Sequence, residues 1–490
     1  MQSYTVRNGE SSPGANPPLY QPLAPDSLEQ IDRTGRRILE RIGVRIVDDR
    51  FLERLAKAGA EVDREDNRVR FPQGWLDEVL ARAPSRFVMH SRDGQNDVRL
   101  GEGKVHFANG GRVFRILDMS TGGYRRTMLR DIANTAILVD HLDNLDFYIV
   151  ACQAHDLELE TYHLNDFFRA FFHTTKHVMG GCDDLVGAGQ VWELASVIAG
   201  GEDKLVERPF FSIITNVVSP LTVNGNSLEI IDFFATKGIP VVCAPAPISG
   251  ATAPATLAGT LVQMHAESLA GVAITQALTP GSKTLYGAVP ATMDLRTMEY
   301  TMGSVEMAMM NSAAVQLAKL YQLPIYASAG LTEAKRPDIQ AGFEKLFSNL
   351  TVAMAGADCV HLAAGLMDSG NSISYEQFVI DNEIIGMIRR KLDGIAVNED
   401  TLAYDVIEQV GPGGNYVAED HTVDHMLDEF FYPNLSVRCN FDIWEERGRP
   451  DMLSRAHAFV KQTLLEGRET RIDPEVIESI KQTLPGLRNV

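Results

Sequence analysis

The sequence predicts an α/β protein built on a (β/α)8 barrel, with helical extensions at both ends. Eight short apolar runs, each ending in small or polar residues, start 30 to 43 residues apart. Each interval has room for one strand, one helix and two loops, and continuous apolarity is typical of strands covered on both faces. An open, doubly wound sheet stays as the alternative, because spacing alone does not separate the two folds. The runs begin at Val105, Asp146, His177, Phe210, Pro240, Lys283, Leu323 and Asp358.

Before the barrel, the sequence predicts an arm and a helical extension. Residues 1–25 are rich in Pro, Gly, Ser and Asn, so we expect a flexible arm. Residues 26–100 form the expected helical extension. Its first helix starts near Asp26 and ends at Gly43, and two more helices are expected at Asp49–Lys57 and Pro72–Arg82.

The barrel is expected to span residues 101–396 and to end with a well-marked helix. Ser374 and Gln377 have the spacing of a capping box, and Gly394 ends the apolar periodicity. Residues 397–490 are predicted to form a C-terminal acidic segment with helices from Asp451. Between residues 397 and 432 there are nine acidic residues and no Lys or Arg. This stretch either sets the choice of partner or is simply solvated.

Charge and cysteine content limit the class of protein. A formal net charge of -20 and a pI of about 5.1 argue against a nucleic-acid-binding surface, which needs clustered Lys and Arg. They are compatible with a cationic substrate or a basic partner. The five cysteines are few, odd in number and far apart, so we expect a reducing, cytoplasmic location. No signal-peptide core and no long apolar span are apparent, so no membrane is expected.

The candidate site follows from the barrel, because the reactive face of this fold lies at the carboxyl ends of the strands. Those ends offer no lysine for a Schiff base and no pair of carboxylates. Cys152, Cys182, Cys243 and Cys359 lie on or beside strands, but they lack metal-site spacing and are interpreted as small core residues, so no metal is expected. The substrate-binding candidates are Phe107, Asn109, Gln153, Asn216, Tyr286, Ser328, Gly330 and His361, with Phe378 from the helix after the eighth strand.

These candidates are neutral hydrogen-bonding groups and aromatic rings. Aromatic faces over a fixed positive charge form a cation–π cage, worth about 0.5–2 kcal/mol per good contact. Ordinary barrel packing is the alternative for the same aromatic rings. His361 either contacts a substrate carboxylate or caps its strand.

Three blocks of the sequence carry a resemblance to a known family. They are GLTEAKRPDIQAGFEK, GADCVHLAAGLMDSGNSISYEQFVIDNEIIGMIRR and VGPGGNYVAEDHT, all between residues 323 and 445. In order and spacing they resemble the trimethylamine methyltransferase superfamily. The resemblance implies a barrel whose mouth receives the cobalamin of a separate corrinoid protein. It also implies a pyrrolysine in the members that use trimethylamine. This chain has no pyrrolysine. We expect the residue at the corresponding position to lie near Ser328 to Leu331, at Gly330.

The missing pyrrolysine favours a quaternary amine as the methyl donor. When Co(I) displaces a methyl group, a tertiary amine would leave as an amide anion, whereas a quaternary ammonium leaves as a neutral amine. We therefore expect a corrinoid-dependent methyltransferase, with glycine betaine favoured as donor. Proline betaine, carnitine or a sulfonium on the same barrel, and a non-catalytic protein that binds a quaternary amine, are the alternatives.

Protein partners are expected at two places. Glu376, Asp381 and Glu383 follow the eighth strand, where they would contact the corrinoid protein, or would instead be ordinary helix-surface and loop-capping carboxylates. The cobalamin is expected on that partner, with no metal bound by this chain. Barrels of this size often associate through outer helices, so a homo-oligomer is also expected.

Overall fold

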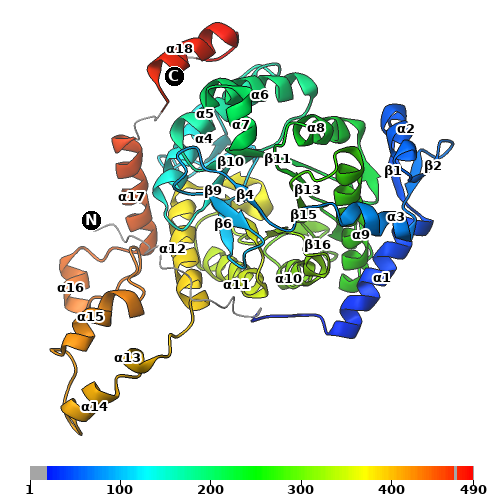
Figure 1. The fold of residues 1–490 in the computed structure, drawn as a ribbon. Helices are drawn as coiled ribbons and strands as arrows, with labels where there is room; N and C mark the ends of the chain where they lie inside the picture. Colours follow the sequence, from blue (N-terminus) through cyan, green and yellow to red (C-terminus); the bar gives the residue numbers. More distant parts are fainter. Residues whose placement is uncertain (1–18, 468–471, 489–490) are drawn as a thin grey trace.

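The computed structural model describes residues 19–467 and 472–488. Its centre is a closed barrel of eight parallel strands, in the order β6, β9, β10, β11, β13, β15, β18 and β19 (Figure 1). Each of the eight predicted runs contains one strand. The strands are β6 (His106–Asn109), β9 (Phe147–Ile149), β10 (His177–Gly180), β11 (Phe211–Thr215), β13 (Val241–Cys243), β15 (Thr284–Ala288), β18 (Ile325–Ser328) and β19 (Cys359–Ala364). Pairing of β19 with β6 closes the barrel and rules out the open sheet.

A ring of helices surrounds the strands and covers their outer faces (Figure 1). Several of these helices begin at a side chain that caps a free main-chain N–H, among them Asp184, Ser304 and Asp338. The ring consists of α4 (Leu129–His141), α5 (Tyr162–His173), α6 (Leu185–Ala199), α7 (Glu202–Glu207), α8 (Gly225–Ala235), α9 (Leu257–Leu278), α10 (Val305–Leu320), α11 (Ile339–Ala355) and α12 (Tyr375–Leu392).

A hairpin of β4 (Phe87–Met89) and β5 (Val98–Leu100) closes the amino-terminal end of the barrel. Phe87 and Met89 belong to the same buried cluster as Phe147 and Met179 from inside the barrel. The loop of this hairpin is anchored before β10, where the main-chain N–H of Arg92 donates to the carbonyl of Thr175 (2.7 Å). The opposite, carboxyl end is therefore the end left for a ligand.

Two small sheets form from the loops at that carboxyl end. The loops after β6 and β19 supply β7 (Arg115–Leu117), β8 (Tyr124–Arg126), β20 (Leu366–Met367) and β21 (Ser372–Ile373), which make one four-stranded sheet. The loops after β13 and β15 supply β14 (Ile248–Ser249), β16 (Ala291–Asp294) and β17 (Glu299–Thr301). The loops around the entrance to the barrel are therefore paired with one another in two small sheets.

The amino-terminal extension contains the three expected helices, but it is not purely helical. Its helices are α1 (Pro25–Arg41), α2 (Asp49–Lys57) and α3 (Gln73–Leu80). Between them lie three short strands, β1 (Val44–Ile46), β2 (Glu61–Asp63) and β3 (Arg68–Arg70). They form a sheet in the order β12, β1, β3, β2, in which β12 (Thr222–Val223) comes from the loop after β11. Three-residue strands are too short to show a period in the sequence. Residues 1–18 of the expected arm lie outside the described residues.

Helix α12 spans the predicted segment, but its amino-terminal cap is only half of the expected box. Ser374 Oγ accepts from the main-chain N–H of Gln377 (3.4 Å). The Gln377 side chain does not reach back to Ser374 and instead donates to Asp381 Oδ1 (2.8 Å). The amide is therefore used in a buried polar network next to the barrel.

Six helices follow α12 in the residues that the structure describes, and four of them begin before the expected start at Asp451. They are α13 (Glu399–Leu402), α14 (Tyr404–Val410), α15 (Asp420–Glu429), α16 (Phe441–Glu446), α17 (Met452–Glu466) and α18 (Pro474–Thr483). Helix α17 packs on α12 and α4. Residues 395–446 are called the C-terminal arm. Its helices α13 and α14 extend away from the barrel (Figure 1), whereas the segment around residue 436 returns to α12. None of the helices in the described part of the chain is long and apolar enough to cross a membrane.

A fully buried ion pair joins the carboxyl ends of β18 and β19. Lys345 Nζ, on α11, donates to Asp381 Oδ2 (2.9 Å) on α12 and to the carbonyl of Gly330 (2.5 Å). Asp381 Oδ2 also accepts from the main-chain N–H of Gly365 (2.8 Å). Because Gly330 follows β18 and Gly365 follows β19, two side chains from neighbouring helices fix both strand ends.

We predict that Lys345→Met lowers the stability of the protein by about 3–5 kcal/mol, because it leaves the Asp381 carboxylate buried without its counter-charge. The midpoint of urea unfolding, followed by circular dichroism, measures this change. Arg33→Met is the matched control, because Arg33 pairs with Glu29 on an exposed helix face and such a pair contributes at most about 1 kcal/mol. Equal midpoints for the two variants would contradict the assigned role.

Candidate active site

The strands of the barrel alternate between side chains that fill its interior and side chains that pack on the helices. The interior cluster includes Ala108, Ile149, Ala244, Tyr326 and Cys359. Their neighbours along the strands therefore face the helix layer. This alternation divides the predicted candidates into two groups, because a continuous apolar run does not show which of its residues point inward.

Four predicted contacts pack on or between the strands. The guanidinium of Arg389 lies 5.3 Å from the centre of the Phe107 ring, and Tyr286 Oη is 2.8 Å from His265 Nδ1 on α9. Asn109 joins β6 to β9, because its Oδ1 accepts from the main-chain N–H of Ile149 (2.9 Å). Phe378, fully buried on α12, lies where a side chain at Gly365 would stand. The cage expected from these aromatic rings is thus corrected: they pack within the fold.

Gly330 offers a main-chain position with no room for a side chain. Its φ is +73°, and a Cβ there would stand 2.4 Å from the carbonyl oxygen of Ala363. Its N–H donates to Ser348 Oγ (3.0 Å), and its carbonyl accepts from Lys345. This backbone therefore has no space at residue 330 for a long side chain in place of the glycine.

Ser328 and His361 are the predicted residues that meet in the interior. His361 Nε2 is 2.7 Å from Ser328 Oγ, and the imidazole stacks on Tyr326 with ring centres 3.7 Å apart. Burial lowers the pKa of His361 to about 3. The histidine is consequently neutral at pH 7. Its Nδ1 is buried and has no hydrogen-bond partner among the described residues.

An irregularity of the β19–β6 pairing includes His361. The register between β19 and β6 shifts between Val360 and Ala364, and Leu362 has a φ of +63°. Bulges at the rim of a barrel redirect side chains. Between these two pairs β19 advances by four residues and β6 by two, and His361 lies within the irregular stretch.

The rim of the barrel carries groups that the sequence reading only partly identified. Asn216, which it predicted, is exposed after β11, and Gln153 is half-buried after β9. Phe114, which it missed, is 54% exposed and lies edge-on to His155, with ring centres 5.9 Å apart. Half-buried Tyr300 on β17 was also missed. Both missed aromatic residues lie beyond the strand ends, in loops that form small sheets. The strands of these sheets are too short to give a periodic pattern in the sequence.

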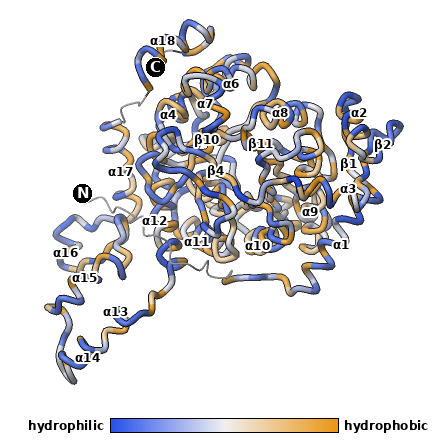
Figure 2. Tube along the Cα trace, viewed as in Figure 1, coloured by the Kyte–Doolittle hydropathy of each residue, from blue (hydrophilic) through white to orange (hydrophobic). Residues whose placement is uncertain are grey.

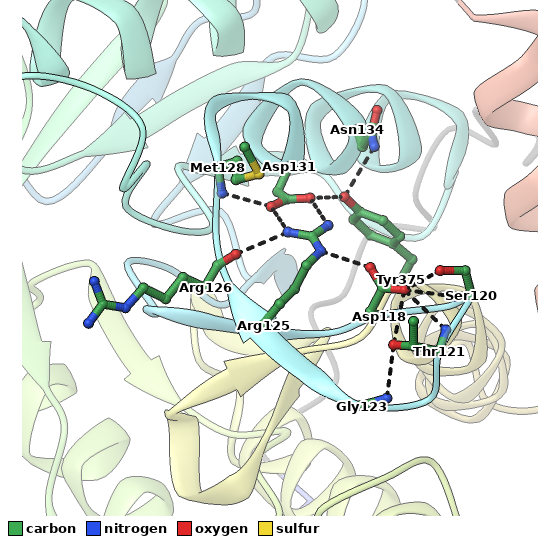
Figure 3. Close-up of polar contacts among 10 residues, drawn as sticks. All are labelled: Asp118, Ser120, Thr121, Gly123, Arg125, Arg126, Met128, Asp131, Asn134 and Tyr375. Atoms are coloured by element: carbon green, nitrogen blue, oxygen red, sulfur yellow. Dashed lines mark hydrogen bonds and ion pairs between the residues drawn. The ribbon is translucent and has the colours of Figure 1, made fainter.

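Arg125 holds the loop that carries Phe114 in place. Its guanidinium binds both carboxylate oxygens of buried Asp131 (2.7 Å each) and donates to Asp118 Oδ2 (2.8 Å) (Figure 3). Tyr375 Oη, at the start of α12, donates to Asp131 Oδ1 (2.6 Å). The hairpin of β7 and β8 is thereby tied to α4 and α12.

The three carboxylates expected to meet a corrinoid protein are buried instead. Glu376 Oε2 accepts from Ser374 Oγ (2.9 Å), and Glu383 Oε1 accepts from the main-chain N–H of Ser436 (2.8 Å). Asp381 pairs with Lys345 as described above. This corrects the expectation of an exposed docking surface, since α17 and the segment around residue 436 cover these faces of α12.

The cysteines near the barrel are buried thiols. Burial raises the pKa of Cys243 to about 11 and that of Cys152 well above its ordinary value, so both stay protonated at neutral pH. In the part of the chain that the structure describes, the one group of three His, Cys, Asp or Glu side chains placed to hold a metal ion is Asp400, His421 and His425. That group lies on the C-terminal arm.

Comparison with known proteins identifies the family. Residues 5–484 match the family model described as Trimethylamine methyltransferase (MTTB). A trimethylamine methyltransferase of Desulfitobacterium hafniense is 35% identical over 432 residues, which cover 88% of this chain and 87% of that protein. A glycine betaine methyltransferase from another strain of that species is 32% identical over 460 residues, covering 94% and 95%.

Solved structures agree on the fold. The monomethylamine methyltransferase MtmB of Methanosarcina barkeri is similar with a TM-score of 0.50 at 11% sequence identity, covering 91% of this chain and 88% of that one. A hydroxylamine complex of MtmB gives a TM-score of 0.51 with the same coverage. The family model and the curated relatives extend over almost the whole chain, which therefore belongs to the trimethylamine methyltransferase family and is a methyltransferase on a (β/α)8 barrel.

Proposed function

We propose that this methyltransferase takes one methyl group from a quaternary amine and transfers it to Co(I) of a cobalamin carried by a separate corrinoid protein. The electron pair of the broken N–CH3 bond stays on nitrogen, which leaves as a neutral tertiary amine, while the cobalt electron pair forms the new bond to carbon. No proton is needed. The protein then has to bind the cation, orient one methyl group and exclude water.

The neutrality of the interior carries this proposal. His361 is uncharged at pH 7, and burial raises the pKa of Tyr326 well above its ordinary value. Ser328 completes this group of neutral side chains. A tertiary amine would need a group that protonates or otherwise activates the leaving nitrogen, and none of these three residues is an acid at neutral pH. A quaternary donor makes no such demand.

We propose glycine betaine as the methyl donor. The relatives named for trimethylamine and for glycine betaine are almost equally similar to this chain, at 35% and 32% identity. The absence of pyrrolysine and the lack of room at Gly330 favour glycine betaine. With its proton on Nδ1, His361 would accept from Ser328 at Nε2, in place of the bond that Ser328 Oγ otherwise donates to the carbonyl of Ala288 (3.1 Å), and would offer Nδ1–H to the substrate carboxylate. Rim aromatic rings such as Phe114 are available for the cationic end.

The carboxyl end of the barrel is the face that we propose for the corrinoid protein, which brings the cobalamin with it. The acidic composition and the scattered cysteines support a cytoplasmic location without a nucleic-acid partner. Proline betaine, carnitine or a sulfonium remain alternative donors on the same site.

We predict that the purified chain methylates Co(I) cobalamin with glycine betaine and does not do so with trimethylamine, because only the quaternary nitrogen leaves without a proton. Absorbance of the methylated cobalamin measures the reaction, with proline betaine and carnitine tested in parallel. Transfer from trimethylamine but from no quaternary amine would contradict the proposal. Calorimetric binding of glycine betaine without transfer of its methyl group would also contradict the proposed reaction.

Substitution of His361 tests its role in the same assay. His361→Phe keeps a ring to stack on Tyr326 but removes both nitrogens. We expect it to raise the KM for glycine betaine about tenfold, as for one lost hydrogen bond to a charged group. Tetramethylammonium has no carboxylate, so its KM serves as the internal control. An equal rise in both KM values would assign His361 to packing instead.

We also propose that the chain forms a homo-oligomer through its C-terminal arm and helix α11. On α11, Ile339 is 87% exposed and Phe343 is 59% exposed, one helical turn apart. The arm presents exposed side chains such as Tyr404, Leu427 and Phe430, and Figure 2 shows hydrophobic segments along it.

The occupant that fits both surfaces is a second copy of the chain. The arm is acidic, and exposed Lys335 and Arg336 precede α11. Aromatic residues bury roughly 150–250 Å² each, so the arm offers enough apolar surface for the roughly 800 Å² per partner of a stable interface. An arm laid on the α11 of another copy would cover both surfaces.

We predict that the chain sediments as an oligomer at micromolar concentration and that Phe343→Glu dissociates it, because the substitution buries a charge in the interface. Val186→Glu, at an equally exposed apolar residue on α6, is the control and should leave the oligomer intact. A monomeric wild-type chain, or an oligomer that survives Phe343→Glu, would contradict this arrangement.

A further inference from the structure

Three potential metal ligands meet between two helices of the C-terminal arm. His421 and His425 lie four residues apart on α15, so their rings share one face of the helix, with ring centres 4.3 Å apart. Asp400, on α13, faces them: His425 Nε2 is 3.1 Å from Asp400 Oδ2, and His421 Nε2 is 3.3 Å from the Asp400 carbonyl oxygen. One ligand atom from each residue lies within 4.8 Å of the other two.

We propose that Asp400, His421 and His425 bind one divalent transition-metal ion, with zinc as the ion that suits them. Two imidazole nitrogens and one carboxylate oxygen are common zinc ligands, and a water molecule would complete a tetrahedron. Bond lengths of about 2.0–2.2 Å require ligand atoms roughly 3.4 Å apart. The Asp400 side chain is 72% exposed, so it is free to rotate through the small distance that remains.

The charge around this cluster favours a cation. The stretch between residues 397 and 432 has nine carboxylates and no Lys or Arg. Such like charges repel one another and attract a divalent ion. A dication at Asp400 would lower this repulsion in a segment that has no Lys or Arg of its own.

The helices of the arm have no buried apolar residues of their own, although Leu435, between α15 and α16, joins the hydrophobic core. Helices α13, α14, α15 and α16 contain no buried residue. Small segments without a core are commonly stabilised by a structural metal, whose binding free energy then contributes to folding. Here the ion would clamp α13 against α15. Asn398 caps α13 by accepting from the main-chain N–H of Thr401 (2.8 Å), so Asp400 is held on an ordered turn.

A bound metal would hold α13 to α15 through both histidines, whereas the ion pair joins Asp400 to His425 alone. A single aspartate would pair with one histidine, whereas here two imidazoles converge on the same residue. The proposal does not depend on methyl transfer, because the arm is separate from the barrel interior. The sequence reading expected no metal, yet the His421-x3-His425 spacing within a helix was a signal for one.

The test uses the full chain after treatment with a chelator. Zinc is titrated by calorimetry, and Co(II) is titrated as a spectroscopic probe whose visible absorption reports on the ligand geometry. We expect one ion per chain for the wild type. His421→Ala and His425→Ala should each weaken zinc binding at least about tenfold. His141→Ala, at a histidine on α4 outside the cluster, is the matched control and should bind as the wild type does.

Hydrogen exchange supplies a second readout that does not depend on activity. Zinc should slow exchange in residues 398–429 of the wild type and of the His141→Ala variant, and should leave the barrel strands unchanged. Failure of the wild type to bind zinc would overturn the proposal. So would unchanged zinc affinity in a double His421→Ala, His425→Ala variant whose barrel exchange is that of the wild type.

Discussion

The buried ion pair of Lys345 and Asp381 fixes the part of the barrel on which the candidate site depends. It holds the main chain at Gly330 and Gly365, directly beyond the ends of β18 and β19. Those two strands carry Ser328 and His361. An uncompensated charge at this depth would be costly, so the pair couples the position of both strand ends to the packing of α11 and α12.

The same region gives the site its chemical character. A bulge in β19 lies beside His361, and burial among uncharged groups keeps its imidazole neutral. Charged groups lie outside this interior, where Arg125 and Asp131 tie the hairpin of β7 and β8 to α4. A neutral interior under a rigid rim suits a reaction in which a preformed cation gives up a methyl group without a proton transfer.

The fold was predictable from the sequence to a greater extent than the site. Eight apolar runs identified all eight strands, because a strand covered on both faces must be apolar throughout. A strand that is apolar throughout does not show which of its side chains point into the barrel. Phe107, Tyr286 and Phe378 were therefore assigned to the carboxyl end of the barrel, which they do not face. Glu376 and Glu383 were expected to be exposed because their partners, His457 and Ser436, lie far away in the sequence. Ser328 and His361 were predicted because each lies at a strand end, and the structure brings the two side chains together; their role as substrate contacts stays a prediction.

The pH dependence of methyl transfer tests the central claim most directly, namely that this site works through neutral groups. The measurement is the single-turnover rate from glycine betaine to Co(I) cobalamin between pH 5 and 9. Because the pKa of His361 is lowered to about 3, the histidine stays neutral over that whole range, and we predict a rate that does not vary with pH. A rate that falls or rises through an ionisation near pH 6 to 8 would contradict the claim, because it would require an acid or base at the reacting nitrogen.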